Sequence, residues 1–136
     1  MIGLVIITHG ALAKELVETA KLIMGESKEV IPVTLAANES LDTLREKSMK
    51  AVQQFKNTGC LVLTDVLGGS PTNICVEFLK TDWIRVLCGV NLPMVMAAIN
   101  GRESLDLQTL AVKVREGAIK GIIDLKDFYE QRTKKK

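Results

Sequence analysis

The chain has 136 residues, of which 47% are hydrophobic and 25% are charged, so its size and composition fit one globular domain and exclude a mainly disordered chain. Its 18 basic and 16 acidic residues give a formal charge of +2, and three of the basic residues form the terminal run 134–136, which leaves no basic surface for nucleic acid. We therefore expect a single domain over residues 1–130 and a basic tail over 131–136.

Short aliphatic runs alternate along the chain with segments whose apolar residues recur at helical spacing. In chain order we predict a strand at 2–8, a helix at 11–24, a strand at 30–35, a helix at 41–55, a strand at 60–64, a helix at 71–79, a strand at 83–88, helices at 93–99 and 104–117, and a short last strand at 119–125. The first strand is apolar from Ile2 to Ile7, which is typical of a strand buried on both faces. Pro32 places the second strand at an edge of the sheet, because proline lacks a backbone donor.

This alternation predicts an α/β fold in three layers, with a mainly parallel sheet between two layers of helices. The flavodoxin-like strand order 2-1-3-4 is the common arrangement for such a sheet, and residues 119–125 are a candidate antiparallel edge strand at its C-terminal side.

Polar residues follow two strands that this order makes neighbours. Strands 1 and 3 end on Thr8-His9-Gly10 and Thr64-Asp65, and the crevice between the carboxyl ends of such strands is where ligands bind. We therefore expect His9, the only histidine, to face Asp65. A carboxylate on one imidazole nitrogen holds the tautomer and leaves the other nitrogen as an oriented nucleophile, which suits phosphoryl acceptance.

A glycine pair precedes the third predicted helix. Gly68 and Gly69 allow the backbone to approach a ligand closely, Ser70 is expected at the N-cap and Pro71 at the first helical position. The free N–H groups at that helix start, with the Ser70 hydroxyl, predict an anion site that meets a phosphate on His9. The other candidate supporting residues are Thr8, Gly10 and Thr72.

Each of these residues also has a purely structural interpretation. A buried histidine commonly donates to the backbone, and an aspartate after a strand commonly caps the following turn. Ser70 is an N-cap on either interpretation, Gly68 and Gly69 can form only a turn, and Thr8 can simply end its strand.

Together these segments resemble the IIA domains of the mannose-type bacterial sugar phosphotransferase system (PTS). The motifs are Thr8-His9-Gly10 after the first strand, Asp65 followed by Gly68-Gly69-Ser70-Pro71 and Asn73, and Gly-Val-Asn-Leu-Pro-Met at 89–94 after the fourth. The resemblance extends from Met1 into the predicted helix at 104–117.

The resemblance implies that His9 accepts a phosphoryl group from the phosphocarrier HPr and passes it to a IIB component, with Asp65 as its hydrogen-bond partner and Ser70 near the phosphate. It implies no metal or cofactor, and only indirect cooperation with the membrane components IIC and IID, which select the sugar. It also implies a homodimer in which a C-terminal strand, here residues 119–125, crosses to the neighbouring sheet. The chain departs from the family at Val66-Leu67, where members often carry Thr-Trp or Leu-Trp, so the docking surface is expected to differ.

Other functions that use the same residues are a regulatory phosphorylatable module and the phosphoryl-transfer subunit of a dihydroxyacetone kinase. The Gly68-to-Pro71 motif favours the sugar-transport function. A serine hydrolase built from Ser70, His9 and Asp65 lacks the nucleophile elbow, because Pro71 removes the backbone donor expected after the nucleophile.

The three cysteines, Cys60, Cys75 and Cys88, lie in apolar segments and are odd in number, which is typical of small core residues in a reducing compartment. The first strand is too short for a membrane span and has no basic region before it. We therefore expect a cytoplasmic protein.

Overall fold

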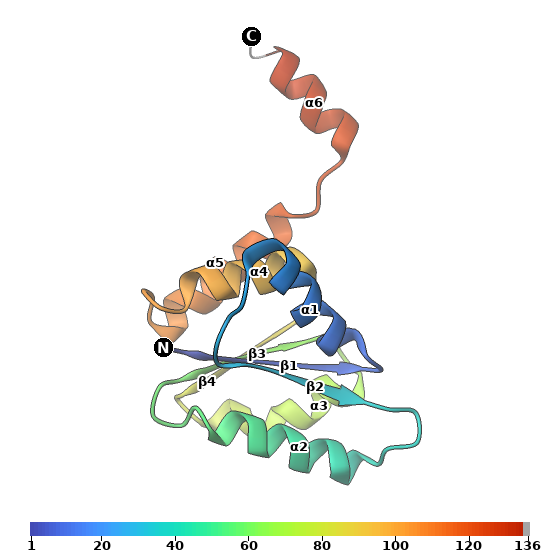
Figure 1. Cartoon of the computed structure of the whole chain (residues 1–136), viewed down its shortest axis with the longest axis vertical. Coiled ribbons are helices and arrows are strands. Elements are labelled where there is room, and N and C mark those ends of the chain that lie inside the picture. Colours follow the sequence, from blue (N-terminus) through green and yellow to red (C-terminus); the bar gives the residue numbers. More distant parts are fainter. Residues whose placement is uncertain (135–136) are drawn as a thin grey trace.

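The computed structural model describes residues 1–134 and contains a four-stranded sheet with helices on both faces (Figure 1). The strands are β1 (Gly3–His9), β2 (Val30–Leu35), β3 (Cys60–Thr64) and β4 (Ile84–Cys88). The helices are α1 (Leu12–Met24), α2 (Leu41–Gln53), α3 (Ser70–Ile74), the 3₁₀ helix η1 (Cys75–Lys80), α4 (Leu92–Gly101), α5 (Leu107–Lys120) and α6 (Leu125–Lys134). Across residues 1–134, every helix is too short or too polar to cross a membrane.

The sheet is parallel throughout and has the predicted order β2-β1-β3-β4. β1 and β3 are the central strands, and Ile7 pairs with Thr64 near their carboxyl ends. β2 lies at an edge, as Pro32 predicts, and that proline is exposed. This order brings the residues that follow β1 and β3 to the same end of the sheet.

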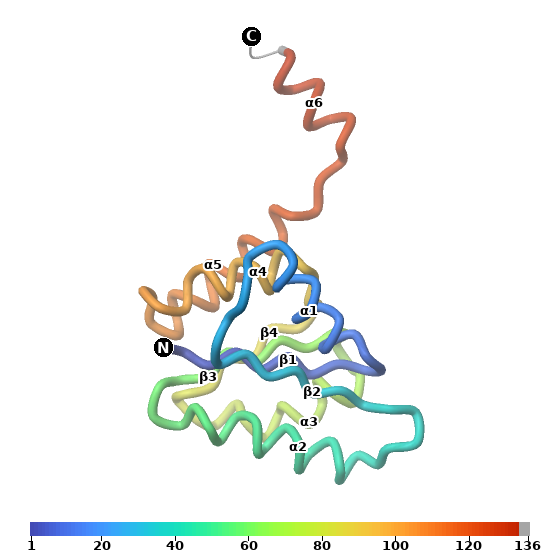
Figure 2. Tube along the Cα trace, viewed as in Figure 1, coloured from blue at the N-terminus to red at the C-terminus, as the bar shows by residue number. Residues whose placement is uncertain are grey.

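Two apolar layers hold the central strands, because side chains of a strand alternate between its faces. In β1, Leu4 and Ile6 face the layer of α1, α4 and α5, whereas Val5 and Ile7 face the layer of α2, α3 and η1. Figure 2 shows α1, α4 and α5 on one side of the sheet and α2 and α3 on the other. All four side chains are at most 1% exposed. Burying each of them contributes about 1.5–3 kcal/mol, so the sheet is a rigid support for residues at its carboxyl end.

The strand predicted at residues 119–125 is wrong. α5 continues to Lys120, because the buried stripe of that helix extends from Leu110 to Ala118, and α6 begins at Leu125 after a short turn. α6 extends away from the body of the molecule (Figure 1). The boundary predicted at residue 130 falls inside α6, and residues 135–136 of the predicted tail lie outside the described residues.

The cysteines divide into two groups. Cys60 and Cys75 are buried as predicted, and burial raises the pKa of each thiol to about 12. Cys88 is exposed, so the prediction of a core residue is wrong there. It is the last residue of an edge strand, where one face is no longer covered.

Two serines, one within α2 and one at its N-cap, allow a paired test of the structure around this helix. The Ser48 hydroxyl is buried without a partner in the described chain, whereas the Ser40 hydroxyl caps the helix by accepting the Thr43 N–H at 3.1 Å. We expect Ser48→Ala to raise the free energy of unfolding by about 1 kcal/mol and Ser40→Ala to lower it by about 1 kcal/mol. Urea denaturation measures both, and a destabilised Ser48→Ala would contradict the described core.

Candidate functional site

His9 and Asp65 are in contact at the carboxyl ends of the two central strands. His9 Nδ1 lies 2.7 Å from Asp65 Oδ2, and the same oxygen accepts the backbone N–H of His9 at 2.9 Å. The second carboxylate oxygen, Oδ1, accepts the Val66 N–H at 3.0 Å. The contact follows from the strand order, whereas the two backbone bonds to Asp65 were not predicted from the sequence.

The charge of Asp65 determines which nitrogen of His9 carries a proton. Partial burial raises the pKa of Asp65, but the hydrogen bonds from His9 and Val66 outweigh it and hold that pKa below its ordinary value. An ionised carboxylate can only accept, so Nδ1 of the neutral ring must be the donor. Nε2 therefore carries the free lone pair, on a side chain that is 49% exposed.

Gly69 packs directly against the imidazole. A Cβ built on Gly69 would lie 3.5 Å from His9 Nε2 but only 2.7 Å from Cε1, which is too close unless the ring or the loop moves. The lack of a side chain therefore lets the loop that follows β3 approach the ring from the side of Nε2.

Two side chains of α3 donate hydrogen bonds to the backbone of the loop from Val66 to Gly69. Thr72 Oγ1 donates to the Val66 carbonyl and Asn73 Nδ2 donates to the Gly68 carbonyl, at 2.7 and 3.1 Å. Gly68 has a φ of +88°, a conformation that glycine adopts without strain. Thr72, one of the candidate supporting residues, therefore holds this loop through its hydroxyl.

The predicted N-cap is displaced by one residue. The Asn73 N–H donates to the Gly69 carbonyl at 2.9 Å, and Gly69 has extended backbone angles, so Gly69 is the N-cap and Ser70 is the first residue of α3. No hydrogen bond of the Ser70 hydroxyl is found in residues 1–134, and none is found for the backbone N–H of Leu67, Gly68 or Ser70. These groups are available to a bound anion.

Two other candidates have structural contacts instead. The Thr8 hydroxyl is fully buried and accepts the Ala13 N–H at 2.8 Å in the first turn of α1. Gly10 donates its N–H to the Leu35 carbonyl at 2.8 Å and has a φ of +54°. Neither group is free to bind a phosphate, so both residues shape the turn that follows His9.

Comparisons with known proteins show which family the chain belongs to. The model of the family described as PTS system fructose IIA component (EIIA-man) matches residues 3–115. The chain belongs to this family of IIA components. The PTS system fructose-specific EIIA component of Bacillus subtilis is 33% identical over 112 residues, which cover 81% of this chain and 77% of that one.

Two further relatives differ in the share of their own length that the chain matches. The PTS system mannose-specific EIIAB component of Escherichia coli K12 is 33% identical over 127 residues, which are 89% of this chain but only 39% of that longer protein. The crystal structure of phosphotransferase system component EIIA from Streptococcus agalactiae is 31% identical, with a TM-score of 0.87, and the match covers 93% of this chain and 99% of that one. The fold of this IIA component is thus shared along nearly its whole length.

The surface of this IIA component next to His9 is partly apolar. Val66 and Leu67 are 55% and 83% exposed, and Leu12 at the start of α1 is 44% exposed. Within residues 1–134 no three His, Cys, Asp or Glu side chains are grouped so as to hold a metal ion.

Gly69→Ala tests the close contact of the loop with the ring. The added methyl group must displace the imidazole, so we expect the hydrogen bond between Nδ1 and Asp65 to be lost. The ¹⁵N resonances of the His9 ring measure that bond directly.

Gly68→Ala is the matched control. A Cβ on Gly68 has no atom within 4 Å, so this variant should lose about 1–2 kcal/mol of stability through backbone strain while the ring signals stay unchanged. Unchanged ring signals in Gly69→Ala would contradict the described packing.

Proposed function

We propose that this IIA component is a cytoplasmic phosphohistidine carrier, which accepts a phosphoryl group from phospho-HPr on His9 and passes it to a IIB component for sugar uptake with phosphorylation. The observation that supports it most is the position of the imidazole: Nδ1 is bound to Asp65 at 2.7 Å, and Nε2 is free on a half-exposed side chain.

In the proposed step, the lone pair of Nε2 attacks the phosphorus of the donor phosphohistidine. A new P–N bond forms at Nε2 as the P–N bond of the donor breaks, and the donor nitrogen regains its electron pair. The ring becomes positively charged while Nδ1 keeps its proton, and the Asp65 carboxylate stabilises that charge. The free N–H groups of Leu67, Gly68 and Ser70 are suited to bind the phosphoryl oxygens.

The apolar surface at Leu12, Val66 and Leu67 is suited to a protein partner, because a phosphohistidine on another protein can reach Nε2 only when the two surfaces are in contact. The hydrolase alternative is disfavoured by the Ser70 hydroxyl, which makes no hydrogen bond with His9 in the described chain. A regulatory module would use the same histidine, so only the identity of the phosphoryl acceptor distinguishes such a module from the proposed carrier.

Incubation with phospho-HPr tests the proposal. We expect the wild type to gain an acid-labile phosphate, detected by intact-mass analysis, and His9→Ala to gain none, because His9 is the only histidine. A wild type that stays unmodified would overturn the proposal.

The acceptor requires a second measurement. Phosphorylated wild type should lose its phosphate to a mannose-type IIB component on mixing, with the label appearing on IIB. Phosphorylation of His9 without transfer to any such IIB would favour the regulatory module instead.

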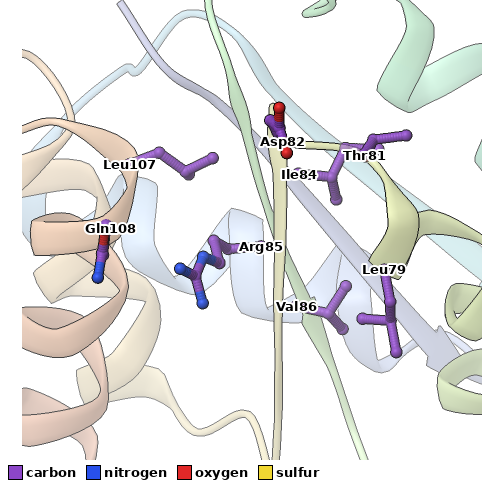
Figure 3. A pocket seen from close by; sticks show the side chains of 8 residues that line it. All are labelled: Leu79, Thr81, Asp82, Ile84, Arg85, Val86, Leu107 and Gln108. Atoms are coloured by element: carbon purple, nitrogen blue, oxygen red, sulfur yellow. The ribbon is translucent and has the colours of Figure 1, made fainter.

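We also propose that this IIA component is a homodimer, and the edge of β4 supports this. Within the described chain β4 pairs only with β3, and a groove of about 520 Å³ extends along its free edge between η1 and α5. Figure 3 shows Leu107 and Gln108 on one side of the strand and Leu79 and Val86 on the other. An uncovered strand edge of this kind is a site for pairing with another chain.

The C-terminal arm, residues 119–129, carries apolar surface that a contact between two copies of the chain would bury. Its exposed large apolar side chains are Ile119, Ile122, Ile123, Leu125, Phe128 and Tyr129. An apolar surface of this extent on a segment outside the core is typical of an interface. A second copy of the chain offers both the arm and the groove, and two copies can exchange them symmetrically.

Ile122→Asp tests the dimer. Ile122 is 78% exposed, so a charge there should leave the fold intact but weaken association, which light scattering after size-exclusion chromatography measures as a shift from dimer to monomer. Leu22→Asp is the matched control, because Leu22 on α1 is 88% exposed and lies outside the arm. A wild type that is monomeric at all concentrations would contradict the proposal.

A further inference from the structure

A pair of threonine hydroxyls lies behind the loop that contacts His9. Thr64, the last residue of β3, is fully buried, and its Oγ1 is 2.7 Å from Oγ1 of Thr72 on α3. Thr72 Oγ1 is also 2.7 Å from the Val66 carbonyl oxygen. These contacts join the end of the central strand, the loop and the helix that follows it.

The directions of these hydrogen bonds follow from counting protons. A carbonyl oxygen can only accept, so the single proton of the Thr72 hydroxyl points to Val66. The Thr64 hydroxyl must then donate to Thr72, because Thr72 Oγ1 is the only hydrogen-bond partner of that hydroxyl in the described chain. The result is two successive hydrogen bonds, from the Thr64 hydroxyl to the Thr72 hydroxyl and from there to the Val66 carbonyl.

The backbone of Val66 connects these two hydrogen bonds to the His9–Asp65 pair. Its carbonyl accepts from Thr72, and its N–H donates at 3.0 Å to Oδ1 of Asp65, whose other oxygen holds His9. Both groups that flank the Val66 Cα are therefore fixed. A rotation of this residue would move the donor that orients the Asp65 carboxylate.

We propose that Thr64 and Thr72 are positioning residues for the His9–Asp65 pair, acting through the backbone of Val66. Neither hydroxyl contacts His9, and the only proton of each is used within the pair or by Val66, so they hold the loop and do not bind the phosphoryl group. This inference rests on the proposed phosphocarrier function for its kinetic test, whereas its spectroscopic test needs only the unphosphorylated protein.

Four variants separate positioning from stability. Thr72→Val removes the donor to Val66 and leaves the buried Thr64 hydroxyl without an acceptor, so it should affect both properties. Thr72→Ser keeps the hydroxyl. Thr64→Val leaves the bond from Thr72 to Val66 intact, and the double variant Thr64→Val/Thr72→Val removes the unpaired hydroxyl as well.

For Thr72→Val we expect phosphoryl acceptance from phospho-HPr with kcat about 10-fold lower and KM within about 2-fold of the wild type, together with a shifted ¹⁵N signal of His9 Nδ1. Its melting temperature should fall by about 4 °C. The rate of Thr72→Ser should be within about 2-fold of the wild-type rate. The rate of Thr64→Val should fall less than the rate of Thr72→Val. The double variant should regain stability relative to Thr72→Val but keep the slow rate and the shifted signal.

Thr58→Val is the control, because Thr58 lies before β3 at the opposite end of the sheet and its hydroxyl contacts are long, at 3.4 Å. It should match the wild type in rate and ring signal. The proposal is overturned by a wild-type rate and ring signal in Thr72→Val, by a rate that recovers with stability in the double variant, or by an equal loss in Thr58→Val. Failure of the phosphocarrier function itself would appear separately, as a wild type that phospho-HPr does not modify.

Discussion

The hydrogen bond between His9 Nδ1 and Asp65 Oδ2 is the interaction on which the rest of the site depends. It forms because β1 and β3 are parallel neighbours, so the residues beyond their carboxyl ends meet at one edge of the sheet. The strand order therefore determines the tautomer of the ring, and the tautomer leaves the free lone pair on Nε2, the nucleophile of the proposed transfer. A different order would separate the two side chains without any change in sequence.

The site also combines rigid supporting strands with an accessible reactive atom. β1 and β3 are buried on both faces up to Thr8 and Thr64, whereas His9, one residue later, is half exposed. The proposed carrier has to meet two proteins in turn and needs this combination, because its nucleophile has to be held in place without being enclosed. The loop from Val66 to Gly69 supplies a wall on one side of the ring and leaves the other side open to a partner.

Much of the fold could be predicted from the sequence, because aliphatic runs and helical spacing record which faces are buried. The strands at residues 30–35 and 60–64 follow from this pattern, and the contact of His9 with Asp65 follows from the strand order that the pattern favours. The strand at 119–125 could not be predicted in the same way, since a strand forms only beside another strand, and this segment pairs with no strand within the described chain. The hydrogen bond between Thr64 and Thr72 could not be predicted either, because hydroxyl contacts leave no periodic pattern in a sequence.

The most direct test of the account is to identify which ring nitrogen carries the phosphate. Phosphorylation of the protein labelled with ¹⁵N in its histidine, followed by measurement of the ³¹P–¹⁵N coupling, distinguishes the two positions. The account predicts coupling to Nε2, with the proton retained on Nδ1 and shared with Asp65. Coupling to Nδ1 would contradict it, because that nitrogen can accept a phosphoryl group only if its hydrogen bond to Asp65 is broken.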